Sequence, residues 1–150
     1  VMRIALYQPE IAGNVGAILR LGACLGTPVD VIEPTGFTLS EKALARSGMD
    51  YAVVVDVRRH LDWAAFEHQV PGRIVLLTTR GGVRLDAAVF QSDDVLLMGS
   101  EGSGVPDAVH ARADLAVRIP LAEGMRSLNI AVATGIALSE ALRQTNGWPA

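Results

Sequence analysis

Lysine and cysteine are nearly missing from this 150-residue sequence, in which Lys42 and Cys24 are the single residues of their types. One cysteine can form neither an intrachain disulfide nor a cysteine zinc cluster. It fits a reducing compartment, so we expect a cytoplasmic protein. No stretch approaches the roughly 18 uninterrupted apolar residues of a membrane span. The N-terminal segment has no basic region followed by a long apolar core, so we expect no signal peptide.

Positive charge is also scarce, because the formal net charge at pH 7 is −3. Nucleic-acid binding usually goes with a basic surface. The cations are almost all arginine, however, and its planar fork suits phosphate better than the point charge of lysine. A GC-rich coding sequence explains the arginine excess equally well, so composition leaves nucleic-acid binding open. The length predicts one domain over residues 1–150 with a sizeable core.

Short apolar runs alternate with stretches of helical character along the chain. This alternation predicts an α/β fold with a mostly parallel sheet flanked by helices. The expected strands are residues 3–7, 28–33, 51–57, 73–79, 94–99 and 115–120. The expected helices are residues 14–26, 40–47, 61–69, 106–112 and 127–144, with Asn14 and Ser40 as N-caps and Gly26 as a stop.

Polar loops with glycine follow four of the expected strands: QPEIAGN, TTRGG, GSEGSG and LAEGMRS. The carboxyl ends of parallel strands lie at one edge of a sheet, where open α/β sheets bind ligands. Any one such turn needs glycine for its own geometry, but four together on one edge predict a pocket. In GSEGSG a single carboxylate, Glu101, stands among glycines and serines, which indicates a close approach to the backbone there.

The motifs that these loops lack exclude several classes of ligand. GSEGSG has no Lys-Ser/Thr pair of a P-loop, and it is not a G-x-G-x-x-G dinucleotide fingerprint. His60, His68 and His110 are isolated and are expected on the surface or on helix faces, so we expect no metal site. No Ser/His/Asp or Cys/His set falls on the strand ends. A small organic ligand held largely by backbone groups remains.

The first expected helix carries an arginine that faces away from the core. Arg20 lies about 200° around the helix from Ile18, since an α-helix has 3.6 residues per turn. Gly16 lies four residues earlier on the same side as Arg20, and Asn14 lies at the ligand edge of the sheet. These three residues therefore predict a polar approach to the pocket, although for Arg20 taken alone a solvated surface arginine is the favoured explanation. The expected buried stripe is Ile18, Leu21 and Leu25.

Three motifs resemble those of the SpoU/TrmH class of SPOUT methyltransferases, in the order that this family has them. The first is N-x-G-x-x-x-R at Asn14, Gly16 and Arg20, and the second is GSEGSGVP with Gly99, Glu101 and Gly104. The third is IPLAEGMRSLNIAVATGIALSEALRQ, residues 119–144. The opening ALYQPEIAGNVGAILRL and residues 50–66 are most similar to the smallest members of the class, which methylate the ribose of the wobble nucleotide in certain tRNAs.

This resemblance implies the fold and the reaction. The implied fold is an α/β knot with a trefoil knot in its C-terminal half. The implied activity is S-adenosylmethionine-dependent 2′-O-ribose methylation of the wobble nucleotide, cytidine or modified uridine, in the tRNA anticodon stem-loop. The resemblance also implies a homodimer in the cytoplasm, with no membrane and no metal. Two alternatives stay open: methylation of another RNA such as rRNA, and a non-catalytic knotted RNA-binding module.

The resemblance further assigns residues to the site. Arg20, Asn14 and Asn129 are the implied catalytic residues, with Arg20 orienting the 2′-hydroxyl and gripping phosphate; Arg20, Arg126 and Arg143 are the implied RNA contacts. Glu101 is expected to brace a loop or an arginine. Two departures from the family pattern, Ala131 and Met125, remove hydroxyls that relatives often carry. The implied donor contacts are Leu77, Thr78, Gly81, Gly99, Glu101, Gly104, Ile119, Leu121, Ser127 and Leu128.

Overall fold

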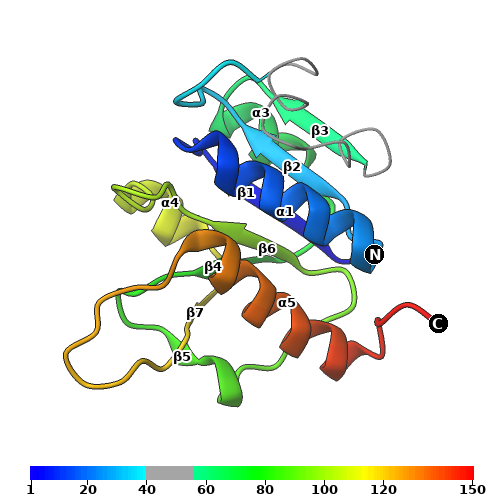
Figure 1. The fold of residues 1–150 in the computed structure, drawn as a ribbon, viewed down its shortest axis with the longest axis vertical. Coiled ribbons are helices and arrows are strands. Elements are labelled where there is room, and N and C mark those ends of the chain that lie inside the picture. Colours follow the sequence, from blue (N-terminus) through cyan, green and yellow to red (C-terminus); the bar gives the residue numbers. More distant parts are fainter. Residues whose placement is uncertain (40–55) are drawn as a thin grey trace.

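A seven-stranded parallel sheet forms the centre of the computed structural model, which describes residues 1–39 and 56–150 (Figure 1). Its strand order is β3-β2-β1-β6-β4-β7-β5, and every neighbouring pair is parallel. This confirms the predicted parallel α/β sheet. The strands are β1 (Arg3–Tyr7), β2 (Val29–Ile32), β3 (Val57–His60), β4 (Ile74–Leu77), β5 (Val83–Arg84), β6 (Val95–Met98) and β7 (Leu115–Arg118).

Helices cover both faces of the sheet (Figure 1). α1 (Ala12–Leu25) and α5 (Ile130–Thr145) lie on one face, and α3 (Trp63–Gln69) and α4 (Asp107–Arg112) lie on the other. A short 3-10 helix, η2, spans Leu85–Ala87. Alternate residues of the strands point to opposite faces of the sheet. In β1, Ile4 and Leu6 therefore point toward α1 and α5, and Ala5 and Tyr7 point toward α3 and α4.

The central strands are buried along their whole length, as the continuous apolar runs predicted. Every residue of β1, β2, β4 and β6 is buried. β6 lies between β1 and β4, with Leu96 opposite both Ile4 and Val75. Parallel strands need helices on both faces to keep such runs from water. The sheet therefore holds the carboxyl ends of β4, β6 and β7 close together, although these strands are far apart in the sequence.

One cluster of charged side chains is buried within this apolar framework. The Arg3 guanidinium donates two hydrogen bonds to the Asp30 carboxylate, at 2.7 and 3.1 Å. The His60 ring nitrogen Nε2 lies 2.9 Å from Asp30 Oδ1. The three side chains are 5%, 5% and 7% exposed. His60 was expected on the surface or on a helix face; that prediction is wrong, because the residue ends β3 and its ring is buried against Asp30 of β2.

Several element boundaries differ from the sequence prediction. α1 begins at Ala12 after the N-cap Ile11, so Asn14 lies inside the helix and is not its cap. α5 begins at Ile130 and not at residue 127, because Asn129 caps it through its side-chain oxygen. β5 and η2 were not predicted, whereas Gly26 ends α1 in a left-handed conformation as predicted.

The expected helix at 40–47 lies outside the described residues, as does most of the expected strand at 51–57. The strand paired with β2 is β3, which overlaps that range only at Val57. Its exposed arginines, Arg58 and Arg59, gave no apolar run from which a strand could be predicted.

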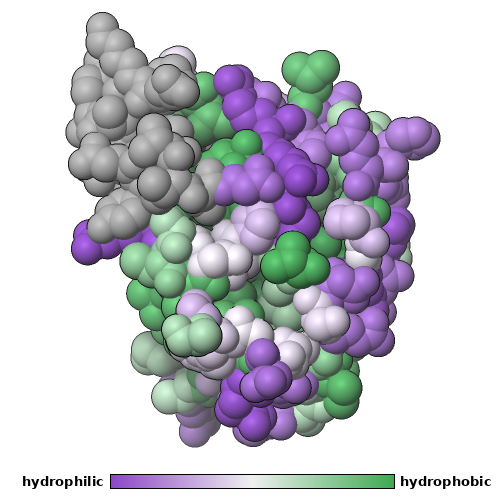
Figure 2. All heavy atoms as spheres, turned by 90° about the vertical axis from the view of Figure 1, so that its right-hand side faces the viewer, coloured by the Kyte–Doolittle hydropathy of each residue, from purple (hydrophilic) through white to green (hydrophobic). Residues whose placement is uncertain are grey.

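Hydrophobic and hydrophilic residues are spread unevenly over the surface. Figure 2 shows one face of the molecule, with hydrophobic residues, in green, mostly left of its centre and hydrophilic residues, in purple, densest along its right-hand edge. On α5 and the loop before it, the exposed apolar side chains are Met125, Leu128, Val132 and Ile136, which are 66%, 39%, 52% and 38% exposed. No helix of the described residues is long and apolar enough to cross a membrane.

Candidate active site

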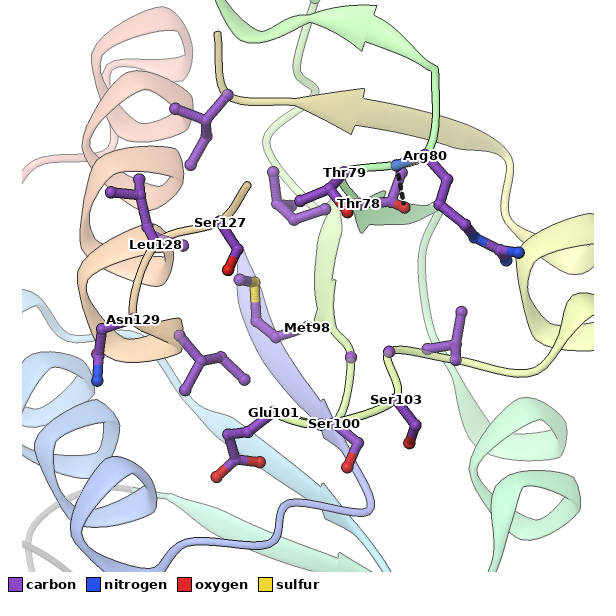
Figure 3. Close-up of a pocket in the computed structure, with 18 of the residues that line it drawn as sticks. Thr78, Thr79, Arg80, Met98, Ser100, Glu101, Ser103, Ser127, Leu128 and Asn129 are labelled. Carbon is purple, nitrogen blue, oxygen red and sulfur yellow. Dashed lines mark hydrogen bonds between the residues drawn. The ribbon is translucent and has the colours of Figure 1, made fainter. Parts of the chain in front are cut away.

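A cavity of about 670 Å³ opens at the carboxyl ends of β4, β6 and β7. Leu76, Leu77, Met98 and Val117 from these strands line it. The four loops that the sequence predicted to share this edge all contribute to the lining, including Asn14, Thr78, Glu101 and Ser127 (Figure 3). The predicted pocket is therefore present, and the first turn of α5 closes one side of it.

The loop after β6 folds back on itself at the floor of the cavity. Ser100 and Gly104 exchange two backbone hydrogen bonds, each 2.9 Å long. A Cβ on Gly99 would lie 2.8 Å from the Cα of Gly104, a distance that real side chains do not show. Gly104 itself has a φ of +66°, which favours glycine. These glycines let the backbone reverse tightly beside the cavity.

Glu101 binds the start of α1. Its Oε1 accepts the backbone N–H of Glu10 at 2.9 Å, and its Oε2 accepts the backbone N–H of Ile11 at 2.8 Å. The Asn14 side-chain amide also donates to Oε2, at 3.3 Å. Backbone donors near a helix N-terminus attract a carboxylate. Glu101 therefore braces a loop, as predicted, and the loop is the one that leads into α1.

Glu10, in the loop after β1, accepts hydrogen bonds from the loop after β6. Its Oε1 accepts the Ser100 hydroxyl at 2.5 Å and the Gly102 backbone N–H at 3.2 Å. These hydrogen bonds, the one from Ser100 above all, hold the pKa of the Glu10 carboxyl below its usual value. We call Glu10, Glu101 and the hydrogen bonds they accept across the two loops the carboxylate clasp. The clasp fixes the loop after β1 against the loop after β6.

Two asparagines extend this network to α5. Asn129 donates through Nδ2 to Asn14 Oδ1 at 3.1 Å. Its own Oδ1 accepts the backbone N–H groups of Ala131 and Val132, at 2.8 and 3.2 Å. A continuous chain of hydrogen bonds therefore runs from the loop after β6, through α1, to the N-terminus of α5 along one side of the cavity.

The family follows from comparison with known proteins. The model of the SpoU rRNA Methylase family matches residues 1–139. The chain belongs to this family. A tRNA (cytidine(34)-2′-O)-methyltransferase of Beijerinckia indica is 49% identical over 144 residues, covering 94% of this chain and 90% of that protein. The enzyme of the same name from Escherichia coli K12 is 39% identical over 151 residues, covering 99% and 96%.

Solved structures of SpoU methylases share the fold. One that concerns the 2-OH methylation of C/U34 on tRNA superposes with a TM-score of 0.89 at 43% identity, covering 95% of each chain. The SpoU methyltransferase AviRb from Streptomyces viridochromogenes, solved in complex with the cofactor AdoMet, gives 0.79 at 27% identity. That match covers 96% of this chain and 57% of AviRb. The resemblance inferred from the three motifs is confirmed.

The structure brings most of the SpoU-type site residues together. Arg20 is exposed on α1 and does not line the cavity, and neither do Gly81 and Arg143. Gly16 was expected on the same outer side of the helix as Arg20 but is buried in α1. The predicted residues that line the cavity are Asn14, Leu77, Thr78, Gly99, Glu101, Gly104, Ile119, Leu121, Arg126, Ser127, Leu128 and Asn129.

Sequence reasoning missed several polar residues at this site, among them Glu10, Ser100 and Arg80. Glu10 and Ser100 stand in the two loops already assigned to the pocket, so their position was the available signal. Arg80 lines the cavity from the loop after β4. Among the described residues, no three His, Cys, Asp or Glu side chains lie together as a metal site requires. The absence of a metal stays a prediction.

Proposed function

We propose that this SpoU methylase transfers a methyl group from S-adenosylmethionine to the ribose 2′-oxygen of the wobble nucleotide in tRNA. The observation that carries the proposal is the cavity itself. Segments from all three family motifs converge there, and the relatives named for this reaction match nearly the whole chain.

The cavity suits a nucleoside-sized donor. Its volume of about 670 Å³ lies in the range of small-molecule sites. Gly99 and Gly104 approach so closely that a Cβ on Gly99 would lie 2.8 Å from the Gly104 Cα, so this loop borders the cavity with its backbone. Leu77, Gly99, Ile119 and Ser127 would hold the donor, largely through backbone groups. The donor supplies an activated methyl group on a sulfonium.

The protein's own contribution is orientation, which can be worth several kcal/mol. Arg20 is a poor general base because a guanidinium does not give up its proton in proteins. We assign it to the acceptor, where its fork would grip phosphate and orient the 2′-hydroxyl. Asn129 Oδ1 already accepts two backbone N–H groups, so its role is to position Asn14 and α5 and not to take the proton. A phosphate oxygen of the RNA is the remaining proton acceptor.

A second subunit and a knot belong to the same proposal. The apolar side chains of α5, Val132 and Ile136 among them, form a surface that a two-fold partner would cover. Arg20 does not line the cavity of its own chain, so a partner's cavity is where it would act.

α5 follows β7 yet packs against α1 and β6, a return path consistent with a C-terminal trefoil knot. A tRNA substrate places the protein in the cytoplasm.

The family description supports a second candidate substrate, since it names rRNA. The decisive experiment maps 2′-O-methylation in total tRNA and rRNA from cells with and without this protein. We expect one ribose methyl group to disappear, at the wobble position of particular tRNAs. Loss of a methyl group from rRNA alone would replace the proposed substrate with the second candidate.

The acceptor role of Arg20 has its own test. We expect Arg20→Ala to lower methyl transfer about 100-fold while leaving donor affinity unchanged. Arg20→Lys should restore little, because a point charge does not reproduce a bidentate grip on phosphate. Methylation of tRNA at the wild-type rate by Arg20→Ala would show that Arg20 is only a surface residue.

A further inference from the structure

Arg80 stands at the edge of the cavity in a fixed backbone position. It follows β4, and its backbone N–H donates to the Thr78 hydroxyl at 3.0 Å. Figure 3 shows its side chain extending away from Ser127 and Met98, toward α4. The side chain is 56% exposed. Arg80 therefore presents a guanidinium to solvent at the rim of the cavity, outside the part lined by Gly99 and Gly104.

The ion pair that holds this guanidinium is weak. Arg80 Nη1 donates to Asp107 Oδ1 at 3.1 Å, and the Asp107 side chain is 95% exposed. His110 Nδ1 lies 3.4 Å from Nη2, at the long limit of a hydrogen bond. Exposed pairs of this kind contribute little to stability. Arg112, by contrast, lies between two acids, Glu67 and Asp114. Arg80 can therefore exchange its partner at small cost.

We propose that Arg80 binds a backbone phosphate of the RNA next to the methylated nucleotide, and that Asp107 competes with this phosphate for the guanidinium. The inference rests on the proposed function, because it needs an RNA at this cavity. The chain has 16 acidic and 13 basic residues, so an RNA must be met by a few well-placed cations. Among the described residues that line the cavity, these cations are Arg80 and Arg126.

Competition makes the two partners act in opposite directions. Phosphate accepts two parallel hydrogen bonds from the arginine fork, whereas Asp107 accepts one. Removing the Asp107 charge frees the fork before the RNA arrives, so RNA affinity should rise. Removing Arg80 deletes the contact, after which Asp107 has nothing to compete for. The carboxylate of the donor is another anion within the cavity's reach, and the test must separate it from phosphate.

The experiment measures binding of a synthetic anticodon stem-loop with cytidine at the wobble position, between 50 and 200 mM salt. The proteins are wild type, Arg80→Ala, Asp107→Asn and the double variant. For Arg80→Ala we expect about tenfold weaker binding and a salt slope reduced by about 0.7–0.9, the value of one phosphate contact. Asp107→Asn should bind up to about fivefold more tightly, and the double variant should match Arg80→Ala.

Arg84→Ala is the matched control, because Arg84 is 51% exposed, pairs with Asp86 and does not line the cavity. It should leave the salt slope unchanged. Equal slopes for wild type and Arg80→Ala would overturn the proposal, as would weaker binding by Asp107→Asn. Weaker donor binding by Arg80→Ala without RNA, measured by calorimetry, would instead assign Arg80 to the donor carboxylate. The binding readout needs no methyl transfer, so a wrong proposed reaction would show separately, as an unmethylated wobble nucleotide with normal stem-loop binding.

Discussion

Carboxylates hold two regions of this molecule in contrasting ways. Across the neighbouring strands β1, β2 and β3, Asp30 binds the side chains of Arg3 and His60, and all three are buried. At the cavity, Glu10 and Glu101 bind mainly the backbone of each other's loop in contact with solvent. A buried pair is costly to break, because the remaining charge has no water. The first arrangement therefore secures the fold, and the second secures the relative position of two loops at the site.

The largest effect on stability should come from Asp30→Ala. It would leave the Arg3 guanidinium, 5% exposed, without its main partner. We expect the free energy of unfolding to fall by about 3–5 kcal/mol, measured by denaturant titration. Asp86→Ala, which breaks an exposed pair with Arg84, is the control and should cost little. A loss below about 1 kcal/mol for Asp30→Ala would remove the contrast between the two regions.

The next effect tests the loop that the clasp holds. Gly99→Val would push a side chain into the Gly104 backbone, which lies 2.8 Å from the Cβ position. We expect donor affinity to fall at least about 100-fold, or about 2.7 kcal/mol, because the loop must move away from the cavity. Calorimetry with S-adenosylmethionine measures it. Gly13→Ala is a suitable control, since a Cβ there meets nothing within 4 Å, and unchanged affinity in Gly99→Val would refute this placement of the donor.

Glu101→Ala should lower the rate of methyl transfer more than it lowers the stability of the fold. It removes the acceptor for two backbone N–H groups before α1, a loss comparable to that of an N-cap, about 1 kcal/mol. The rate of methyl transfer should fall more than stability does, about tenfold or more, since Asn14 loses its orientation. Thermal unfolding and methylation assays on the same variant provide both numbers. Asp86→Ala, at an exposed acid that pairs with Arg84 and does not line the cavity, should change neither by a comparable amount.

The smallest effect is a pH dependence at Glu10. Its hydrogen bonds lower the pKa in the folded state, so they stabilise the protein above the usual glutamate value of about 4.5. Their contribution should vanish as the pH falls below that value and through the lowered pKa. We expect the difference in unfolding free energy between wild type and Glu10→Ala to be constant near neutral pH and to shrink in acid. A difference that grew in acid would contradict the clasp.

Much of the fold could be predicted from the sequence because local pattern and environment agree in its centre. IALY and IVLL are continuous apolar runs, and both lie in buried parallel strands. The pocket could be predicted because parallel strands place their following loops at one edge. β3 could not, since its sequence, VRRH, reflects an exposed position next to β2 and carries no apolar period.

The details of the site depended on partners distant in the sequence. Asn14 satisfies the local pattern of an N-cap, yet the acceptor that serves the start of α1 is Glu101, which stands in the loop after β6. His60 is isolated in the sequence and gains its partner, Asp30, only through the pairing of β2 and β3. Local pattern does not identify such partners; the sheet order does.

The position of β6 has a consequence for how the chain is made. β1, β2 and β3 leave the ribosome well before β6, yet β6 must pair with the free edge of β1. Until then β1 is an apolar edge strand with one unpaired edge, the kind of edge on which other chains add. The nascent protein therefore exposes one edge of a strand that later lies inside the sheet. We expect the yield of folded protein during synthesis to depend on how well this edge is shielded until Val95–Met98 are made.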